Sequence, residues 1–286
     1  MPSAETRFEA IGTTWCLLTP EPLPDVTLDR VRAVVEAYDR TWSRFREDSL
    51  VALVARDGGT VELPHHAVEL LDLYDVLEAR TAGAMTPLVG AGLEALGYDA
   101  GYRLRPRGAP VPAPDARVLR RSGTTLTVAR PVLLDVGAAG KGQLVDLVAA
   151  ELTACGAGEH VVDAGGDMVH RGPEALRVGL QVPGDPERVL GVVELRDAAL
   201  CASGVDRRVW GDGLHHVLDA RTGEPTREVV ATWVVAARAM VADALATAHF
   251  LAGADVLQGV AEHTYVRLHA DGRARYALGL PGAVFT

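Results

Sequence analysis

The feature that most constrains the fold is the order of the hydrophobic segments, in which helices fall between short β stretches without strict alternation. Apolar residues recur at helical spacing from Leu28 to Trp42, and further helices are expected at 65–83, 142–156 and 239–253. Short strands are expected at 8–18, 160–168, 175–182, 189–203 and 230–237. Because a doubly wound parallel sheet needs regular βαβ units, this order favours an α+β fold with a mixed β-sheet core and flanking helices.

Length and composition are those of a folded globular chain. The chain has 286 residues, of which 48% are hydrophobic and 23% are charged. We expect one domain over residues 1–286, with a core large enough to support it. Residues 103–121 are rich in proline and arginine and are flanked by structured segments, so they are a candidate subdomain joint or a surface excursion.

Net charge excludes one class of partner. The formal charge is −10 and the pI is about 5.4, whereas a nucleic-acid surface needs a basic stripe. We therefore expect no nucleic-acid partner. A phosphate ligand would have to be met locally, by a metal ion or a few placed donors. The cysteines are Cys16, Cys155 and Cys201, an odd and widely spaced set that gives neither a disulfide framework nor a zinc signature.

Residues 1–10 show no targeting signal. MPSAETRFEA contains no apolar signal core and no lipobox-like cysteine. Uncharged runs stop well short of the 18 or so residues of a transmembrane helix, so no membrane span is expected. We expect a cytoplasmic protein, with a trimmed form of an exported protein as the alternative.

The segment LLDVGAAGKGQLVD, residues 133–146, suggests a phosphate-binding loop but matches neither common nucleotide motif. A P-loop would have glycine where Asp135 stands and serine or threonine where Gly142 stands, and the spacing of a dinucleotide fingerprint is also missing. One alternative is a tight turn between a strand and a helix. The other is a ligand loop, since Lys141 is the only lysine in the chain and its compact head group suits a narrow site.

A second pair of residues has the chemistry of a metal site. Asp243 and Thr247 are four residues apart in a predicted helix, so they lie on one face. A carboxylate and a hydroxyl are hard oxygen ligands suited to Mg²⁺. The alternative is a solvated helix face, and the pattern of apolar neighbours does not decide between the two.

These segments form a series of motifs in which each member is weak alone. In order along the chain they are 11–13 (IGT), 43–45 (SRF) with Ser49, 83–87 (GAMTP), 135–146, 164–167 (AGGD), 202–204 (ASG), 216–225 (HVLDARTGEP), and 242–243 with Thr247. The series resembles the ApbE family, the FAD:protein FMN transferases, over nearly the whole chain. The resemblance implies an ApbE-like flavin transferase fold.

The resemblance also implies an activity and its residues. The FMN moiety of FAD would pass to a serine or threonine of a target flavoprotein, with Mg²⁺ as cofactor and AMP as leaving group. His216 and Asp243 would be catalytic. The metal ligands would be the Ala138 carbonyl, Asp243 and Thr247. FAD would contact Ala84, Met85, Thr86, Asp135, Lys141, Gly165, Gly166, Ser203 and Leu218. For His216 a purely structural hydrogen bond is the alternative, and His215 beside it is expected to behave differently because neighbouring residues of a strand point to opposite sides.

Several positions depart from the family pattern. Ile11, Leu50, Ala55, Ala202 and Ala220 replace the usual residues of their motifs. Met85 and Thr86 replace a phenylalanine and an aspartate in a segment that the family places at FAD. We therefore expect weaker FAD binding than in a relative with the usual pair. Two other functions stay open: a Mg²⁺-dependent FAD pyrophosphatase that gives FMN and AMP, and a non-catalytic flavin-binding protein.

Overall fold

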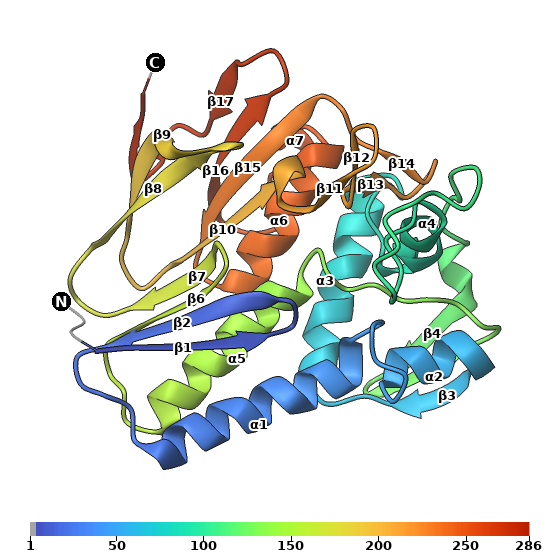
Figure 1. The fold of residues 1–286 in the computed structure, drawn as a ribbon, viewed down its shortest axis with the longest axis horizontal. Helices are drawn as coiled ribbons and strands as arrows, with labels where there is room; N and C mark the ends of the chain where they lie inside the picture. Colours follow the sequence, from blue (N-terminus) through green and yellow to red (C-terminus); the bar gives the residue numbers. More distant parts are fainter. Residues whose placement is uncertain (1–3, 286) are drawn as a thin grey trace.

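The computed structural model describes residues 4–285 and is built around one eight-stranded sheet (Figure 1). The spatial order of its strands is β1-β2-β6-β7-β10-β15-β16-β17. Their bounds are β1 (Ala4–Ala10), β2 (Thr13–Thr19), β6 (His160–Ala164), β7 (Asp167–Arg171), β10 (Ala199–Gly204), β15 (Val229–Ala236), β16 (His263–His269) and β17 (Ala274–Tyr276).

The α+β class is confirmed, but the expectation of a mixed sheet needs a correction. All seven neighbouring pairs in this sheet are antiparallel. A parallel pair needs a crossover that returns the chain to the end where the previous strand began. Here β1–β2 and β6–β7 are joined by short turns, and the longer helical connections also bring the chain back antiparallel to its neighbour.

Helices cover one face of the central sheet. They are α1 (Asp25–Trp42), α3 (His66–Arg80), α5 (Gly140–Ala154) and α6 (Ala239–Leu251), and together they bury the main core. In strand β15, successive side chains point to the two opposite faces of the sheet. Val234 and Ala236 pack into this helical core, whereas Trp233 and Val235 point to the opposite face, as the two-residue period of a strand requires.

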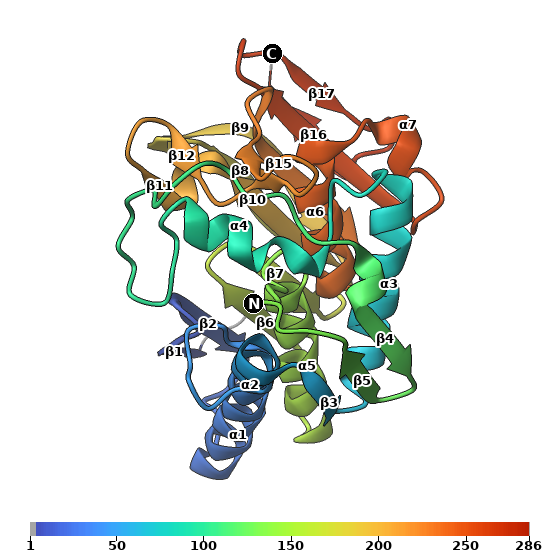
Figure 2. The ribbon, with the colours of Figure 1, turned by 90° about the vertical axis from the view of Figure 1, so that its right-hand side faces the viewer.

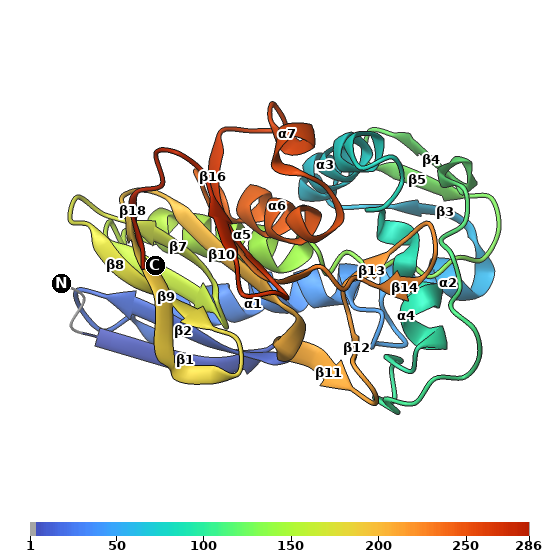
Figure 3. The same ribbon diagram turned by 90° about the horizontal axis from the view of Figure 1, so that it is seen from above.

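The opposite face is covered by a second antiparallel sheet (Figure 3). Its order is β18-β9-β8, with β8 (Leu176–Val182), β9 (Asp185–Leu195) and β18 (Gly282–Val284). Leu180 and Val193 pack there against Leu200 and Trp233 of the central sheet. The central strands are therefore buried on both faces, which explains why β15 reads as a continuous apolar run.

Most of the remaining elements lie at the far end of the helical layer, whereas α7 lies beside α6 (Figures 1 and 2). They are α2 (Leu50–Asp57), β3 (Gly59–Glu62), η1 (Pro87–Val89), α4 (Gly90–Ala95), η2 (Ala116–Val118), β4 (Leu119–Ser122), β5 (Thr125–Val128), η3 (Val205–Arg208), β11 (Val209–Trp210), β12 (Leu214–His215), β13 (Leu218–Asp219), β14 (Glu224–Pro225) and α7 (Ala254–Leu257). Residues 103–115 contain no helix or strand, and 116–121 form η2 and most of β4. A joint between subdomains in 103–121 stays a prediction. No helix between residues 4 and 285 has both the length and the apolar content needed to cross a membrane.

The first expected strand, 8–18, is wrong because the chain turns in its middle. Strands β1 and β2 form a hairpin whose two-residue turn is Ile11–Gly12, with φ of 44° and 77°. Positive φ at both positions is typical of the turn that joins twisted strands. Isoleucine rarely adopts positive φ, so the sequence carries only half of the usual turn signal.

Helices α5 and α6 meet at an unusually close crossing. A Cβ added to Gly142 would lie 2.2 Å from the Ala239 carbonyl oxygen and 2.7 Å from the Asp243 Cβ. Only glycine allows this approach.

We predict that Gly142→Ala destabilises the protein by about 1–3 kcal/mol, because the added methyl must push two packed helices apart. Chemical denaturation measures the change in the free energy of unfolding. Gly158→Ala is the matched control, since its Cβ would meet no atom within 4 Å and its φ is not positive. Equal stability of the two variants would contradict the close crossing.

Candidate active site

The glycine-rich segment is a tight turn that leads directly into α5. The Asp135 Oδ1 accepts a hydrogen bond of 2.7 Å from the Gly137 N–H, and the Val136 carbonyl accepts one of 2.7 Å from the Gly140 N–H. The segment is therefore a tight turn between a loop and a helix, and its role as a ligand loop stays a prediction.

Lys141, in the first turn of α5, forms an ion pair with Asp167 at the start of β7. Asp167 is fully buried and the lysine side chain is 25% exposed. Burial alone would lower the pKa of Lys141, but the negative charges of Asp167 and Asp243 outweigh it and raise that pKa. Lys141 is therefore a cation held against two carboxyl groups. Asp167 was not among the expected site residues, although it ends the 164–167 motif.

Asp243 is the most perturbed group of this cluster. It is 4% exposed, and its Oδ2 accepts a hydrogen bond of 2.9 Å from the Gly142 N–H. Burial, and then repulsion from Asp167, raise its pKa to about 8. Asp243 therefore carries a proton near neutral pH unless a cation replaces it. The alternative of a solvated helix face is wrong for this residue, because α6 is buried on nearly all sides.

Thr247 lies one turn further along α6. Its Oγ1 is 3.5 Å from the Oγ of Ser203, which belongs to β10. One of the two expected metal ligands, Thr247, therefore lies beside the expected FAD-binding residue Ser203. The two residues are 44 positions apart in the sequence.

Tyr74 of α3 locates the third expected metal ligand. Its hydroxyl is buried and has no hydrogen bond within the described residues. Burial, followed by the charges of Asp135 and Asp243, raises the pKa of Tyr74, and the backbone of Ala138 lies close enough to lower it in part. The charges of Asp135 and Asp243 and the backbone of Ala138 thus all act on this one buried hydroxyl.

The donor set fits a hard divalent cation. A carboxylate, a threonine hydroxyl and a main-chain carbonyl are all oxygen ligands of the kind that Mg²⁺ takes together with water and phosphate oxygens. Within residues 4–285 no group of three His, Cys, Asp or Glu side chains is arranged as metal ligands, so Asp243 would need the threonine hydroxyl, the main-chain carbonyl, water and phosphate to complete the set. A buried carboxyl group whose pKa is raised to about 8 is also a group that a cation would stabilise in its ionised form.

Asp135 connects this cluster to a second polar group. Its Oδ2 accepts a hydrogen bond of 2.6 Å from Arg44 Nε, and the Arg44 side chain is only 2% exposed. The guanidinium lies 4.2 Å from the ring centre of Phe45 and 4.7 Å from that of Tyr98. Both terminal nitrogens of Arg44 are buried without a hydrogen-bond partner in the structure. Arg44 belongs to the 43–45 motif, and the family resemblance implied no role for it.

His216 lies in the same neighbourhood and differs from His215. The Nδ1 of His216 is buried and unpaired in the described chain. Burial, and then the positive charge of Arg208, lower the pKa of His216 to about 4, while Asp135 acts in the opposite direction. In contrast, His215 bonds to the Thr226 carbonyl at 2.8 Å and accepts from the Val217 N–H at 3.3 Å. The two histidines therefore differ in their contacts, as expected, but not for the expected reason, because β12 ends at His215 and His216 lies outside the strand. His215 is hydrogen-bonded on both ring nitrogens, and His216 is neutral with an unpaired Nδ1.

The altered segment Ala84–Thr86 is buried beside these groups. Met85 is 3% exposed and packs in the main core, and Thr86 is 6% exposed and caps η1 by accepting from the Leu88 N–H at 3.4 Å. The Ala84 carbonyl accepts from the Ala220 N–H at 3.0 Å, which holds this segment beside β13 and Leu218. An aspartate at Thr86 would place a second carboxyl group beside Glu78, whose pKa burial already raises.

Gly165 and Gly166 form the turn between β6 and β7, with φ of 65° and 103°. A Cβ on Gly165 would lie 2.3 Å from Thr13 Oγ1. The Gly166 N–H donates to Asp163 Oδ1 at 2.9 Å. The glycines are required by the backbone itself, and they leave the main chain exposed beside the Lys141–Asp167 pair.

Asp146, the last residue of the 135–146 motif, holds α6 in place from α5. Its two carboxylate oxygens accept from the Ala239 and Met240 N–H groups at 2.9 and 3.0 Å. A carboxylate at this position satisfies the free N–H groups of the first turn and complements the helix dipole, a contribution of about 1 kcal/mol. Asp146 thus fixes the start of the helix that carries Asp243 and Thr247.

Comparison with known proteins adds sequence relatives. The chain is 32% identical to the FAD:protein FMN transferase of Rhodobacter capsulatus over 289 residues, which cover 93% of this chain and 54% of that protein. It is 28% identical to the FAD:protein FMN transferase of Treponema pallidum, covering 87% and 78%. The chain thus spans about half the length of the Rhodobacter relative.

Solved structures give the same fold. The ApbE protein of Thermotoga maritima superposes with a TM-score of 0.82 at 23% identity, and flavin transferase ApbE of Vibrio cholerae with 0.78 at 21%, each covering 96% of both chains. The expected ApbE-like fold is therefore confirmed. The model of the ApbE family matches residues 11–270, so this chain is a member of the ApbE family.

Proposed function

We propose that the protein is a Mg²⁺-dependent transferase that moves the FMN moiety of FAD onto a serine or threonine of an acceptor flavoprotein. Membership in the ApbE family and the names of its relatives support this function. The observation that carries the proposal is the buried cluster of Lys141, Asp167 and Asp243 beside the glycine-rich turn. Such a cluster offers one fixed cation and one carboxyl group ready to bind a second cation, which is what a diphosphate requires.

Different residues of the site would bind the metal ion, the diphosphate and the rest of FAD. Asp243, Thr247 and the Ala138 carbonyl would hold Mg²⁺, which when bound supplies positive charge to the phosphate oxygens. Lys141 would bind the same diphosphate from α5. Asp135, Ala84, Met85, Thr86, Gly165, Gly166, Ser203 and Leu218 would contact FAD, as the family resemblance implies.

His216 would act on the acceptor. Its imidazole is neutral at pH 7, because its pKa is lowered to about 4, and its Nδ1 has no partner in the structure. It can therefore accept a hydrogen bond from a serine or threonine hydroxyl. The hydroxyl oxygen would form a bond to the phosphorus of the FMN moiety while its proton passes to His216 Nδ1, the P–O bond to AMP would break, and AMP would leave with the displaced oxygen.

The two alternative functions, a FAD pyrophosphatase and a non-catalytic flavin-binding protein, would use the same site. A pyrophosphatase would let water take the place of the acceptor hydroxyl, and a non-catalytic binder would hold FAD without breaking it. Incubation with FAD, Mg²⁺ and a recombinant acceptor domain separates the three. A transferase gives a fluorescent acceptor band on a denaturing gel together with AMP, a pyrophosphatase gives FMN and AMP only, and a binder gives no product.

We predict that Asp243→Asn abolishes Mg²⁺-dependent FAD turnover, with a fall of about 100-fold or more, because an amide cannot supply the charge that the metal needs. The fold should be retained, since an amide oxygen can still accept from the Gly142 N–H. Asp271→Asn, on an exposed turn, is the matched control. Turnover close to wild type in Asp243→Asn would remove this residue from the metal site.

We predict that Mg²⁺ binding in the presence of FAD releases a proton below a pH of about 8. The pKa of Asp243 is raised to about 8, so the metal must displace its proton, and the affinity for Mg²⁺ should fall as pH decreases from about 8.5 to about 6.5. Calorimetry in two buffers of different ionisation enthalpy measures the proton count. An affinity that does not change over this range would contradict the buried, protonated state of Asp243.

We predict that Lys141→Arg weakens FAD binding by about tenfold or more, even though the charge is kept. The Lys141 ammonium pairs with a fully buried carboxylate, and the wider planar guanidinium would have to reach the same buried oxygen in a different geometry. Fluorescence titration with FAD measures the effect, with Lys141→Met as the variant that removes the charge. Wild-type affinity in Lys141→Arg would show that the single lysine is an accident of composition.

A further inference from the structure

Arg44 is a buried cation whose end groups have no partner in the described chain. Its side chain is 2% exposed, and its Nε donates to Asp135 Oδ2 at 2.6 Å. The two terminal nitrogens, Nη1 and Nη2, are buried and form no hydrogen bond within residues 4–285. A buried donor without an acceptor is costly, and more so when it belongs to a charged group. Arg44 therefore holds two N–H donors that a ligand would satisfy.

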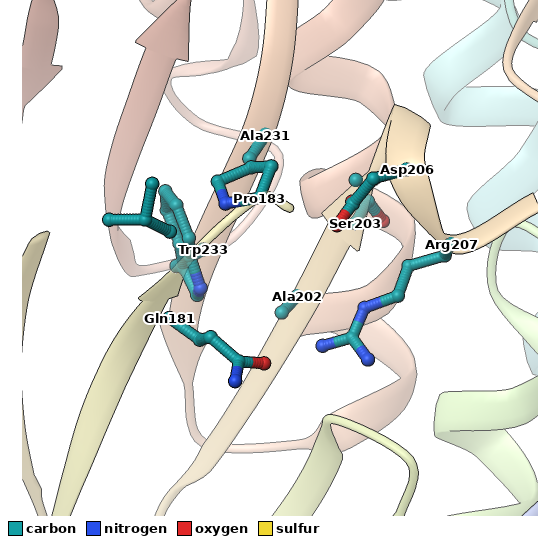
Figure 4. A pocket seen from close by; sticks show the side chains of 10 residues that line it. Gln181, Pro183, Ala202, Ser203, Asp206, Arg207, Ala231 and Trp233 are labelled. Atoms are coloured by element: carbon teal, nitrogen blue, oxygen red, sulfur yellow. The ribbon is translucent and has the colours of Figure 1, made fainter. Parts of the chain in front are cut away.

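Other arginines near the site differ from Arg44. Arg207 lies on the rim of a small pocket beside Ser203 (Figure 4), and its side chain is exposed, so water can bond to its nitrogens. The Arg46 guanidinium is used by carboxylates, with bonds between 2.8 and 3.2 Å to Asp48, Glu36 and Asp39. Within residues 4–285, Arg44 is the one arginine whose two terminal nitrogens are both buried and unpaired.

The Arg44 guanidinium is fixed beside the glycine-rich turn. One carboxylate joins the two, because Asp135 Oδ1 accepts from the Gly137 N–H at 2.7 Å while Oδ2 accepts from Arg44. The guanidinium carbon lies 4.2 Å from the ring centre of Phe45 and 4.7 Å from that of Tyr98, distances at which a cation is attracted to an aromatic ring. The group is thus held in one place before a ligand binds, which lowers the entropic cost of binding.

An aromatic cluster of Phe45, Tyr98, Tyr102 and Trp210 surrounds this end of Arg44. Tyr98 stacks on Trp210 with ring centres 5.6 Å apart, and Tyr102 stacks on Phe45 at 5.1 Å with 12° between the ring planes. Tyr98 and Trp210 are buried, whereas Tyr102 is 50% exposed. Its φ is 47°, a backbone conformation that tyrosine rarely adopts. Tyr102 is therefore the member of the cluster that an entering planar ring can displace without opening the core.

The two free donors of Arg44 distinguish between the parts of FAD. The commonest bidentate partner of arginine among the bases is guanine, where O6 and N7 are neighbouring acceptors. The oxidised isoalloxazine ring has the same arrangement in O4 and N5, and a second acceptor pair in O2 and N1. Adenine has no such pair, because its N7 acceptor lies beside the N6 amino donor. A diphosphate also suits an arginine, but here it would lie among aromatic rings, and the cluster of Lys141 and Asp243 is already proposed for it.

Resting on the proposed function, we propose that Arg44 is a FAD-binding residue that recognises the flavin ring. The ring enters the aromatic cluster where Tyr102 lies, and Nη1 and Nη2 of Arg44 donate to two neighbouring acceptors on its edge. Asp135 holds the guanidinium in place through Nε. Arg44 thus determines the preference for flavin over adenine at this end of the site, while Lys141, six residues after Asp135, binds the diphosphate.

The test compares FAD with ADP, which shares the adenosine and the diphosphate of FAD but has no flavin. Calorimetry with Mg²⁺ gives Kd for FAD, FMN and ADP in wild type and two variants. Arg44→Lys keeps the charge and a donor for Asp135 but removes the two-donor fork. Arg46→Lys is the matched control, because Arg46 belongs to the same segment and its guanidinium bonds to carboxylates. Thermal unfolding of each protein shows whether the fold is kept.

We expect Arg44→Lys to raise Kd for FAD and for FMN about tenfold or more, with Kd for ADP within twofold of wild type and no change in Arg46→Lys. A Kd for FAD within twofold of wild type in Arg44→Lys overturns the assignment. An equal loss for ADP also overturns it, and assigns Arg44 to the diphosphate or to the fold of the turn. If wild type transfers no FMN to an acceptor domain, the proposed function fails, whereas the expected split between FAD and ADP in Arg44→Lys still supports the flavin contact.

Discussion

The close crossing of α5 and α6 is the contact on which the rest of the site depends. Gly142 lets the Ala239 carbonyl and Asp243 approach the first turn of α5, and its own N–H bonds to the Asp243 carboxyl group. One turn further along, Asp146 binds the first N–H groups of α6. The sheet below supplies Asp167 and Ser203. A cation, two carboxyl groups and two hydroxyls thus meet because two helices touch at a residue without a side chain.

Several charged or polar groups of the site are buried in unfavourable surroundings, and a bound ligand would stabilise them. Removing one partner of a buried ion pair such as Lys141–Asp167 typically costs about 3–5 kcal/mol, so this pair is a fixed part of the fold. Asp243 forms no salt bridge of its own among the described residues, and burial, followed by repulsion from Asp167, raises its pKa to about 8 in spite of the nearby Lys141. Arg44 and His216 add buried nitrogen atoms without hydrogen bonds in the structure. Buried polar groups without partners are rare in folded proteins. Arg44, which bonds to Asp135, and Tyr74 and His216, on which the Asp135 charge acts, are three of those in the described chain.

Local sequence patterns predicted the main helices of the fold. The spacing of apolar residues gave the helices, and Gly156, with φ of 89°, ends α5 as expected. What failed depended on tertiary context. Ile11 at positive φ is stabilised by its hairpin and not by its own preference, and the antiparallel order of the sheet follows from long connections that carry no local signal. The burial of Asp243 was also invisible, because α6 is covered on all sides and has almost no amphipathic pattern. Asp146 and Arg44 act through partners 91 or more residues away.

The central claim is that the glycine-rich turn and α6 together hold a divalent cation against the diphosphate of FAD. A crystal structure of the protein with Mn²⁺ and FAD, with anomalous scattering recorded for the metal, tests it directly. The account predicts one strong anomalous peak at about 2.1–2.2 Å from Asp243, Thr247 Oγ1 and the Ala138 carbonyl oxygen, bridged to phosphate oxygens. A metal bound elsewhere, or FAD bound with Asp243 left in contact only with Gly142, would contradict it.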